Sequence, residues 1–331
     1  MELLLLITSF AVILAGALLF TNAVEWIGHR LAMGEGAVGS LLAAVGTAMP
    51  ETLIAVVALV GATKSEEVAI GAIVGAPFLL GTLAMGLVGL FAFLYRSRRP
   101  DGIRLRAHVE TLDRDLVFFL VFFGGALALG FGAPTEIRVP AGIAFFAAYV
   151  VYVWRTLIRG GEAQAEETLN PLIMARRGGG GRREETLSIA VLQFLVGLGA
   201  MIGGAHLFVE ELLHVAESIG VEAIVLSLIL APLATELPEK VNSFFWVRVG
   251  KDSLALGNIT GAMVFQSTIP VAIGLIFTDW DVSGNAAISM ALGLAGGVLA
   301  YWVLRLRGRF ELPAVIAWIV LYAAFIIIVA A

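Results

Sequence analysis

The feature that most constrains this chain is a series of ten apolar stretches, each about as long as a helix that crosses a bilayer. A helix needs about 20 apolar residues to span the hydrocarbon core. Charged residues make up only 14% of the chain, against about 25% in a soluble domain. The sequence therefore predicts an all-α integral membrane protein with ten transmembrane helices. They are expected at residues 2–27, 36–62, 67–94, 116–133, 138–158, 187–213, 220–247, 253–277, 285–304 and 312–330.

The basic residues predict which side of the membrane each loop faces. When alternate loops are assigned to opposite sides, all but three of the 21 Lys and Arg residues fall on one side. Lys64 and Arg138 fall on the other side, and Lys240 lies inside a predicted helix. Basic residues collect in cytoplasmic loops, so we expect a multi-pass protein of the cell membrane with both termini outside.

The two halves of the chain share a sequence pattern. Residues 16–51 align without a gap on residues 204–239, and residues 71–82 align on residues 257–268. Each half contains five predicted helices, an odd number, so the second half inserts upside down relative to the first. Inverted repeats of this kind are typical of transporters whose binding site lies near the middle of the membrane.

The repeat divides the chain into three parts. Residues 1–158 form the first five-helix repeat, and residues 186–331 form the second, inverted one. Residues 159–185 between them are rich in glycine and in charged residues. A glycine-rich composition is typical of a flexible linker. We expect this linker on the cytoplasmic side, and it is too short to hold a regulatory domain of its own.

Two glutamates lie deep inside predicted helices, each directly after a proline, at Pro50-Glu51 and Pro238-Glu239. A proline inside a helix has no amide hydrogen and clashes with the carbonyl one turn back, so we expect these helices to be interrupted. Carbonyls freed within a membrane must face protein or a water-filled cavity. An acidic residue within a span is costly and marks a functional site. Because the repeat relates the two pairs, we predict that both glutamates bind a cation.

Further oxygen-bearing residues accompany the two pairs. Thr47 and Thr235 precede the glutamates by one helical turn, and Glu236 has no acidic counterpart in the first half. Hard cations prefer carboxylate, carbonyl and hydroxyl ligands, so these three residues are candidate ligands. Glu236 is alternatively a partner of Lys240. Neutral oxygens on the following helix add Asn258, Thr260, Gln266 and Thr268 as candidates.

The helices that follow the proline–glutamate pairs carry small residues at four-residue spacing. Gly71 and Gly75 occupy these positions in the first half, and Gly257 and Gly261 occupy them in the second. Such spacing lets helices approach one another closely, so packing is their expected role. Asn22, near the end of the first helix, is expected at the membrane interface.

Composition excludes several other chemistries. The chain has no cysteine, which excludes disulfides and thiolate metal sites. Its four histidines form no spaced metal motif, and the sequence His-Glu-x-x-His does not occur. We therefore expect no enzyme, no resident cofactor and no nucleic-acid partner. The expected partners are the lipid bilayer and small inorganic cations, and the chain is either a monomer or a homodimer.

The proline–glutamate segments resemble the alpha repeats of the cation/calcium exchanger superfamily, which includes sodium/calcium exchangers. The family pattern reads roughly Gly-Thr-Ser-Leu-Pro-Glu, followed one helix later by Gly-Asn-x-x-Gly-Ser-Asn. Residues 46–51 and 234–239 are similar to the first element, and residues 257–263 to the second. Residues 71–77 share only the glycines of the second element. The resemblance covers nearly the whole chain and implies a sodium/calcium exchanger-like fold.

The resemblance also implies a function. Glu51 and Glu239 look like the central calcium ligands, and Thr47 and Thr235 would add oxygens for calcium or sodium. Alternating access would come from the first and sixth helices sliding against the other eight. The implied activity is secondary antiport of calcium, or another divalent cation, against sodium or protons.

Several ligand positions depart from the family pattern. Oxygens expected for sodium sites are missing, so coupling to several sodium ions is in question. Crowded carboxylates raise one another's pKa, which favours proton binding instead, and magnesium or manganese is an alternative cargo. A cation channel and a membrane protein that binds cations without moving them remain alternatives to antiport. The departing positions are Ala48, Glu236, Ala76, Ala262, Leu80 and Gln266.

Overall fold

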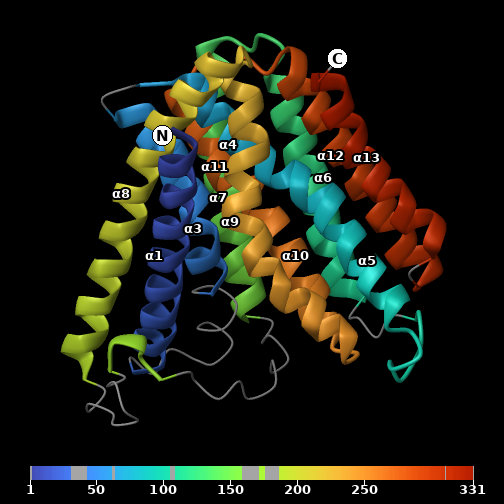
Figure 1. The fold of residues 1–331 in the computed structure, drawn as a ribbon. Helices are drawn as coiled ribbons and strands as arrows, with labels where there is room; N and C mark the ends of the chain where they lie inside the picture. Colours follow the sequence, from blue (N-terminus) through green and yellow to red (C-terminus); the bar gives the residue numbers. More distant parts are fainter. Residues whose placement is uncertain are drawn as a thin grey trace.

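The computed structural model describes residues 2–30, 43–61, 64–104, 109–158, 171–175, 186–309 and 311–330. Within these ranges the chain is almost entirely helical, as the apolar stretches predict. Figure 1 shows the long helices running along one bundle, with the two chain ends at the same end of it.

Each predicted apolar range contains at least one described helix, and the range 67–94 contains three consecutive helical segments. Helix α6 begins at Val109 instead of the predicted residue 116, and helix α8 continues past residue 213 through a polar stretch. The first half contains α1 (Glu2–Arg30), α3 (Ala43–Val60), α4 (Glu66–Leu79), η2 (Leu80–Ala84), α5 (Met85–Leu94), α6 (Val109–Leu129) and α7 (Thr135–Ile158). The second half contains η3 (Ile173–Ala175), α8 (Leu187–Ile219), α9 (Ala223–Arg248), α10 (Asp252–Gln266), α11 (Ile269–Phe277), α12 (Gly284–Trp302), η4 (Val303–Arg307) and α13 (Leu312–Ala330).

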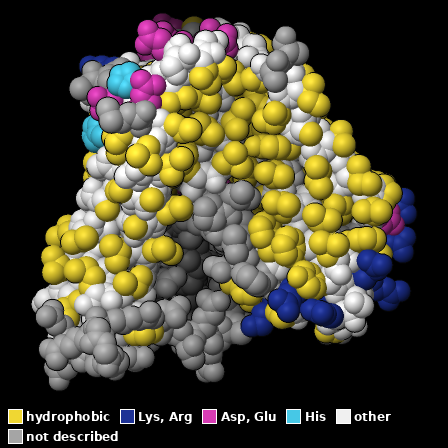
Figure 2. All heavy atoms as spheres, viewed as in Figure 1, with side chains coloured by type: hydrophobic (Ala, Val, Ile, Leu, Met, Phe, Trp, Pro, Cys, Tyr) yellow, Lys and Arg dark blue, Asp and Glu magenta, His cyan; other side chains and the backbone are white. Residues whose placement is uncertain are grey.

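The surface of the bundle fits a membrane. Seven helical segments of the described part are long and apolar enough to cross one. In Figure 2, hydrophobic side chains cover the flank of the molecule. Asp and Glu side chains gather near the end that holds the chain termini, and most Lys and Arg side chains visible on this face lie towards the opposite end. The chain is therefore an all-helical membrane protein.

Two segments form the centre of the bundle. In Glu66–Leu94, 67% of the most apolar stretch of 18 residues is buried in the protein, and in Asp252–Phe277 the share is 78%. The corresponding share in Leu312–Val329 is 22%. A helix that is apolar all round and buried is typical of a protein core. These two central segments are therefore placed to border any internal site.

Both central segments are interrupted along their length. The first changes to a π-helix at η2, between α4 and α5, and the second is interrupted after Gln266, where α10 ends before α11 begins. The repeat aligns Leu80, the first residue of η2, with Gln266. Interruptions of this kind are frequent at functional sites, and their matching positions follow the sequence repeat.

Two aligned threonines lie at these interruptions. Thr82 Oγ1 donates to the carbonyl of Phe78 at 2.6 Å, and Thr268 Oγ1 donates to the carbonyl of Val264 at 2.7 Å. Each hydroxyl thus donates its proton to the carbonyl one turn back in its own helix. Thr268, a candidate ligand from sequence, is therefore engaged with its own backbone.

The prolines do not interrupt their helices, contrary to the sequence prediction. Pro50 lies inside α3 and Pro238 lies inside α9, and both helices continue through them. Neighbouring helices make such prolines tolerable within membrane helices. Each proline still lacks an amide hydrogen, so the carbonyl four residues earlier receives no hydrogen bond from it.

Helices α4 and α9 pack closely through the predicted glycines. A Cβ added to Gly71 would lie 2.9 Å from Ser227 Cβ, and one added to Gly75 would lie 2.8 Å from Pro232 Cγ. The packing role predicted for these two glycines is confirmed. At Gly257 and Gly261 on α10, an added Cβ would have no described atom within 4 Å apart from the neighbouring residues and backbone of its own helix.

Helices α1 and α8 lie side by side along much of their length (Figure 1). A Cβ added to Gly16 would lie 2.8 Å from the carbonyl oxygen of Gly197, and the reverse addition gives the same distance. A Cβ added to Gly204 would lie 2.8 Å from Ile13 Cγ1. The two backbones therefore approach each other as closely as only small residues allow.

Part of the predicted flexible linker is fixed to this helix pair. Of residues 159–185, the structure describes only 171–175, and these include the short helix η3. Leu172 is fully buried and packs in a cluster with Trp26 of α1. The apolar residues of this segment explain the difference, because they bury surface that the surrounding glycines cannot.

Two amide side chains hold η3 in place. The backbone N–H of Ile173 donates to Asn22 Oδ1 at 3.0 Å, and that of Met174 donates to Gln193 Oε1 at 2.8 Å. Gln193 Nε2 also donates to Asn22 Oδ1 at 2.8 Å. Asn22, expected at the membrane interface, therefore joins α1, α8 and the linker in one hydrogen-bond network.

Replacing Gln193 by Ala should weaken the attachment of η3 to α1 and α8. The change removes a buried acceptor and donor, and unmade buried hydrogen bonds cost about 1–3 kcal/mol. We expect chymotrypsin to cleave after Leu172 roughly 10-fold faster, since about 1.4 kcal/mol corresponds to that factor. Leu192→Ala, on the exposed face of the same helix, is the control and should leave the rate unchanged. An unchanged rate in Gln193→Ala would mean that η3 stays bound without this amide.

A buried ion pair closes the arginine-rich end of the bundle. Arg99, in the loop after α5, donates from Nη1 and Nη2 to the two carboxylate oxygens of Asp252 at 2.8 and 2.9 Å. The Arg99 and Asp252 side chains are 1% and 2% exposed. The same guanidinium also donates to the carbonyls of Gly102, Arg104 and Val247. All five N–H donors of Arg99 are therefore used, and they join the first half to the start of α10.

Candidate cation-binding site

Glu51 is buried inside the bundle. It follows Pro50 on α3, and its side chain is 2% exposed, with both carboxylate oxygens shielded from solvent. Helix α3 packs against α4, α9 and α10. Burying a carboxylate is costly unless protein groups or a cation compensate for the lost water. The structure thus places this predicted ligand in the interior, among the helices of both halves.

Glu236 and Gln266 form the second part of the site. Glu236, on α9, is 1% exposed, and Gln266, at the end of α10, is fully buried. Gln266 Nε2 donates to Glu236 Oε1 at 2.9 Å. The other end of this amide, Gln266 Oε1, is buried and has no hydrogen-bond partner among the described residues. A buried amide oxygen of this kind is a ready acceptor for a proton donor or a cation.

The remaining predicted ligands have different surroundings. Thr235 is fully buried, and its hydroxyl donates to the carbonyl of Ala231 at 2.9 Å. Asn258 Oδ1 accepts a hydrogen bond from Ser243 Oγ at 3.2 Å. Asn258 precedes Gln266 by two helical turns, or about 12 Å along the helix axis. The structure therefore joins Gln266 to Glu236 directly, and it joins Asn258 to a different part of α9.

Two predicted ligands lie on described helices but have side chains outside the described part of the structure. Thr47 lies on α3, one turn before Glu51, and Glu239 lies on α9, three residues after Glu236. The side chain of Lys240 is also outside this part. Among the side chains that the structure does describe, no three His, Asp or Glu residues come close enough together to hold a metal ion.

Asp115 is a buried acid that the sequence reasoning missed. It lies on α6, is 2% exposed, and accepts hydrogen bonds from Thr260 Oγ1 at 2.9 Å and from Tyr152 OH at 2.8 Å. Arg114 also donates to it at 3.0 Å. Thr260, a candidate ligand from sequence, thus donates its proton to Asp115. The predicted helix began at residue 116, so this acid looked like part of a solvated loop.

The arrangement of the buried polar side chains defines a class of protein. Acidic and amide side chains are buried among the helices of a membrane bundle, and the amide of Gln266 lies at one of the two interruptions that repeat between its halves. In membrane helices such residues face the bundle interior and mark ion or substrate pathways. This is the architecture of an ion-handling membrane protein.

The chain belongs to the sodium/calcium exchanger protein family. The model of that family matches residues 1–158 and 189–331, which confirms the resemblance seen in the alpha repeats. The family is one of ion exchangers, not of enzymes. The inner membrane protein YrbG of Escherichia coli is 24% identical over 254 residues, covering 74% of this chain and 70% of that protein. The sodium/calcium exchanger MaX1 of Methanosarcina acetivorans is 21% identical over 301 residues, covering 85% and 84%.

Solved structures share the fold. The H+/Ca2+ exchanger CAX superposes with a TM-score of 0.76 at 17% identity, covering 98% of this chain and 82% of that one. The sodium–calcium exchanger NCX_Mj superposes with a TM-score of 0.59 at 20% identity, covering 98% of both chains. The exchanger-like fold predicted from the sequence is therefore correct.

Proposed function

We propose that this protein is a secondary active antiporter that exchanges calcium, or another divalent cation, for sodium or protons. The cation binds at a mid-membrane site that contains Glu51 and Glu239 as its carboxylates, with Glu236 and Gln266 beside them. Thr47 and Thr235 supply additional oxygens. The relatives named as sodium/calcium and H+/Ca2+ exchangers support this assignment through the family and the fold.

The observation that carries the proposal is the contact between Glu236 and Gln266. The carboxylate and the amide are buried at 1% and 0% exposure, and the amide oxygen has no partner among the described residues. A buried acceptor that lacks a donor is costly, so a ligand that supplies positive charge would offset this cost. A divalent cation prefers carboxylate and carbonyl oxygens of this kind.

The membrane topology is part of the proposal. Ten helical spans form two inverted five-helix repeats, residues 1–158 and 186–331, joined by a cytoplasmic linker at 159–185. Both chain ends lie at the same end of the bundle in Figure 1, as an even number of spans requires. Most of the basic side chains visible in Figure 2 lie towards the opposite end. By the distribution of basic residues, the termini are outside and the protein resides in the cell membrane.

Alternating access arises in this proposal from movement of α1 and α8 against the other helices. These two helices pack closely on each other. Only 28% of the most apolar stretch of 18 residues in α8 is buried in the protein. A pair that packs mainly on itself and on lipid can move without opening the central core. The movement exposes the site to each side of the membrane in turn.

Flux through liposomes tests the assignment. Purified protein in liposomes should take up radioactive calcium when an outward gradient of sodium or of protons is imposed, and take up little without one. Uptake that follows the calcium gradient alone, without a counter-ion, would indicate a channel. Calcium binding without flux under either gradient would indicate a protein that binds cations but does not transport them.

Replacing Gln266 by Leu should weaken cation binding without abolishing transport. Leucine removes the amide but keeps a similar volume, and Leu80 already occupies the aligned position in the first half. Losing one hydrogen bond or ligand to a charged group costs about 1.5–3 kcal/mol, so we expect a calcium concentration for half-maximal uptake about 10-fold higher. Leu192→Ala, at an exposed position on α8, is a control away from the amide. An unchanged calcium dependence in Gln266→Leu would exclude this oxygen as a ligand.

A further inference from the structure

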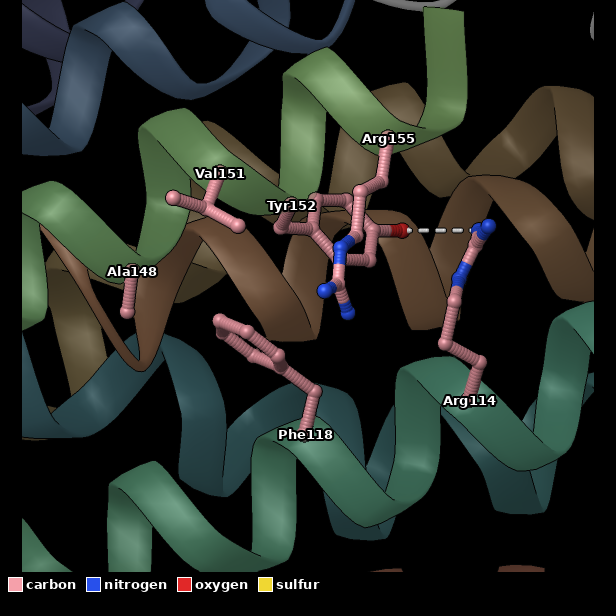
Figure 3. Close-up of a pocket in the computed structure, with 6 residues that line it drawn as sticks. All are labelled: Arg114, Phe118, Ala148, Val151, Tyr152 and Arg155. Atoms are coloured by element: carbon pink, nitrogen blue, oxygen red, sulfur yellow. Dashed lines mark hydrogen bonds between the residues drawn. The ribbon is translucent and has the colours of Figure 1, made fainter. Parts of the chain in front are cut away.

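A pocket lies between α6 and α7, away from the candidate cation site. It encloses about 340 Å3, and Figure 3 shows its lining from both helices. Four of the lining side chains are apolar or aromatic, and the other two are arginines. The six lining residues are Arg114, Phe118, Ala148, Val151, Tyr152 and Arg155.

The two arginines place positive charge beside the pocket. Arg114 is held by Asp115 and Tyr152: its Nη2 donates to Asp115 Oδ1 at 3.0 Å and to Tyr152 OH at 3.2 Å. Its Nη1 takes no part in these bonds. Arg155 is exposed, and no described side chain pairs with its guanidinium. Asp115 pairs with Arg114, and no acidic side chain of the described residues is paired with Arg155, so the pocket keeps an excess of positive charge.

The wall of the pocket opens on the lipid-facing side of the bundle. Val151 is 46% exposed, and its neighbours Val150 and Trp154 on α7 are exposed as well. Val117 and Val121 on α6 are 46% and 62% exposed. In a membrane protein, such apolar side chains contact acyl chains. The pocket thus joins an apolar lipid-facing surface to two arginines at one end of the bundle.

We propose that this pocket binds the headgroup and upper acyl chain of an anionic phospholipid. Guanidinium groups bind phosphate oxygens in pairs of hydrogen bonds, and basic pockets between helices on the cytoplasmic side bind acidic lipid headgroups. A soluble anion would leave the apolar wall unused, and a neutral lipid would leave the excess charge unmatched. An anionic phospholipid satisfies both parts of the pocket.

The bound lipid stabilises the contact between α6 and α10. Asp115, which holds Arg114, also accepts the hydrogen bond from Thr260 on α10. A phosphate on Arg114 keeps that guanidinium over the Tyr152 ring, where it lies 4.8 Å from the ring centroid. The chain of contacts from lipid to Arg114, Asp115 and Thr260 thus reaches the helix that ends at Gln266.

Native mass spectrometry of the purified protein tests the proposal and does not depend on transport. The protein should retain phosphatidylglycerol and should not retain phosphatidylcholine with the same acyl chains. Arg155→Gln should weaken phosphatidylglycerol retention about 10-fold, since one guanidinium–phosphate pair is worth roughly a factor of that size. Val151→Trp fills the apolar part and should cause a similar loss with all charges intact.

The control is Arg98→Gln, which removes the same charge from an exposed arginine outside the pocket. It should retain phosphatidylglycerol as the unchanged protein does. Equal loss in Arg98→Gln and Arg155→Gln would overturn the proposal in favour of general attraction to a basic surface. Full retention of phosphatidylglycerol by Val151→Trp would also overturn the proposal. If Val151→Trp does not fold, Ala148→Leu takes its place in this test. Competition by glycerol phosphate, which lacks acyl chains, at the same concentration as the lipid would overturn the proposal too.

Discussion

Glu51→Gln should abolish cation exchange while leaving the protein folded. Glutamine keeps the shape of the side chain and removes its negative charge. Two opposite unit charges about 4 Å apart attract each other by about 4 kcal/mol at a protein-like dielectric constant, and the bound cation loses this attraction. We therefore expect calcium uptake to fall by at least about 100-fold. The measurement is radioactive calcium uptake into liposomes under an imposed sodium or proton gradient.

A stability measurement separates this effect from misfolding. A buried neutral amide is less costly than a buried carboxylate, so the melting temperature of Glu51→Gln should equal or exceed that of the unchanged protein. Glu67→Gln makes the same chemical change at an exposed position at the start of α4 and should leave uptake unchanged. Normal uptake by Glu51→Gln would remove this residue from the transport site.

Arg99→Ala should cause a large loss of stability. The substitution leaves the buried carboxylate of Asp252 without its guanidinium, and three backbone carbonyls lose a donor. Breaking a buried pair by removing one partner costs about 3–5 kcal/mol. We expect the melting temperature to fall by on the order of 10 °C, followed by tryptophan fluorescence in detergent.

Two related substitutions make the prediction specific. Arg99→Lys keeps the charge but cannot form the paired hydrogen bonds to a carboxylate, so it should recover only part of the loss. Arg98→Ala, at the exposed neighbouring position, should change the free energy of unfolding by less than about 0.5 kcal/mol. Equal effects of Arg98→Ala and Arg99→Ala would mean that the buried pair contributes no special stability.

Apolar stretches located the helices well because the membrane imposes their length and composition. Helix α13 begins at Leu312 and ends at Ala330, as predicted. The main differences lie at polar helix ends, such as the last turns of α8. There the sequence becomes polar several residues before the helix ends. The prolines misled the prediction, because residues 50 and 238 read locally as helix breakers while tertiary packing keeps both helices continuous. The π-helix η2 has no local sequence signal that distinguishes it from α-helix.

The candidate site was only partly predictable. The repeat singled out Glu51, and the structure places it in the interior of the bundle, while its role as a cation ligand stays a prediction. The hydrogen bond between Glu236 and Gln266 joins residues on different helices, so no spacing rule reveals it. The roles of Glu239 and Thr47 remain predictions, since their side chains lie outside the described part of the structure.

The burial of Asp115 and the packing of η3 on α1 and α8 were not predicted from the sequence. A single acid at the edge of an apolar stretch resembles a solvated residue until the opposing Thr260 and Tyr152 are known. The linker carries a signal that was available: the apolar run Leu172 to Ala175 stands within a glycine-rich and charged segment. An apolar run in such surroundings buries itself wherever a neighbouring surface accepts it.

The close packing of α1 on α8 has a consequence for following the protein spectroscopically. Gly16 and Gly197 leave no room for the two backbones to approach further, and Asn22 joins both helices to η3. A one-turn slide of about 5.4 Å between them would break these contacts, so the pair behaves as a single rigid body. Leu18 and Leu195 both face outwards. The distance between spin labels at these two positions should therefore stay constant. A label on α8 paired with one on α13 would instead report the movement proposed for that body.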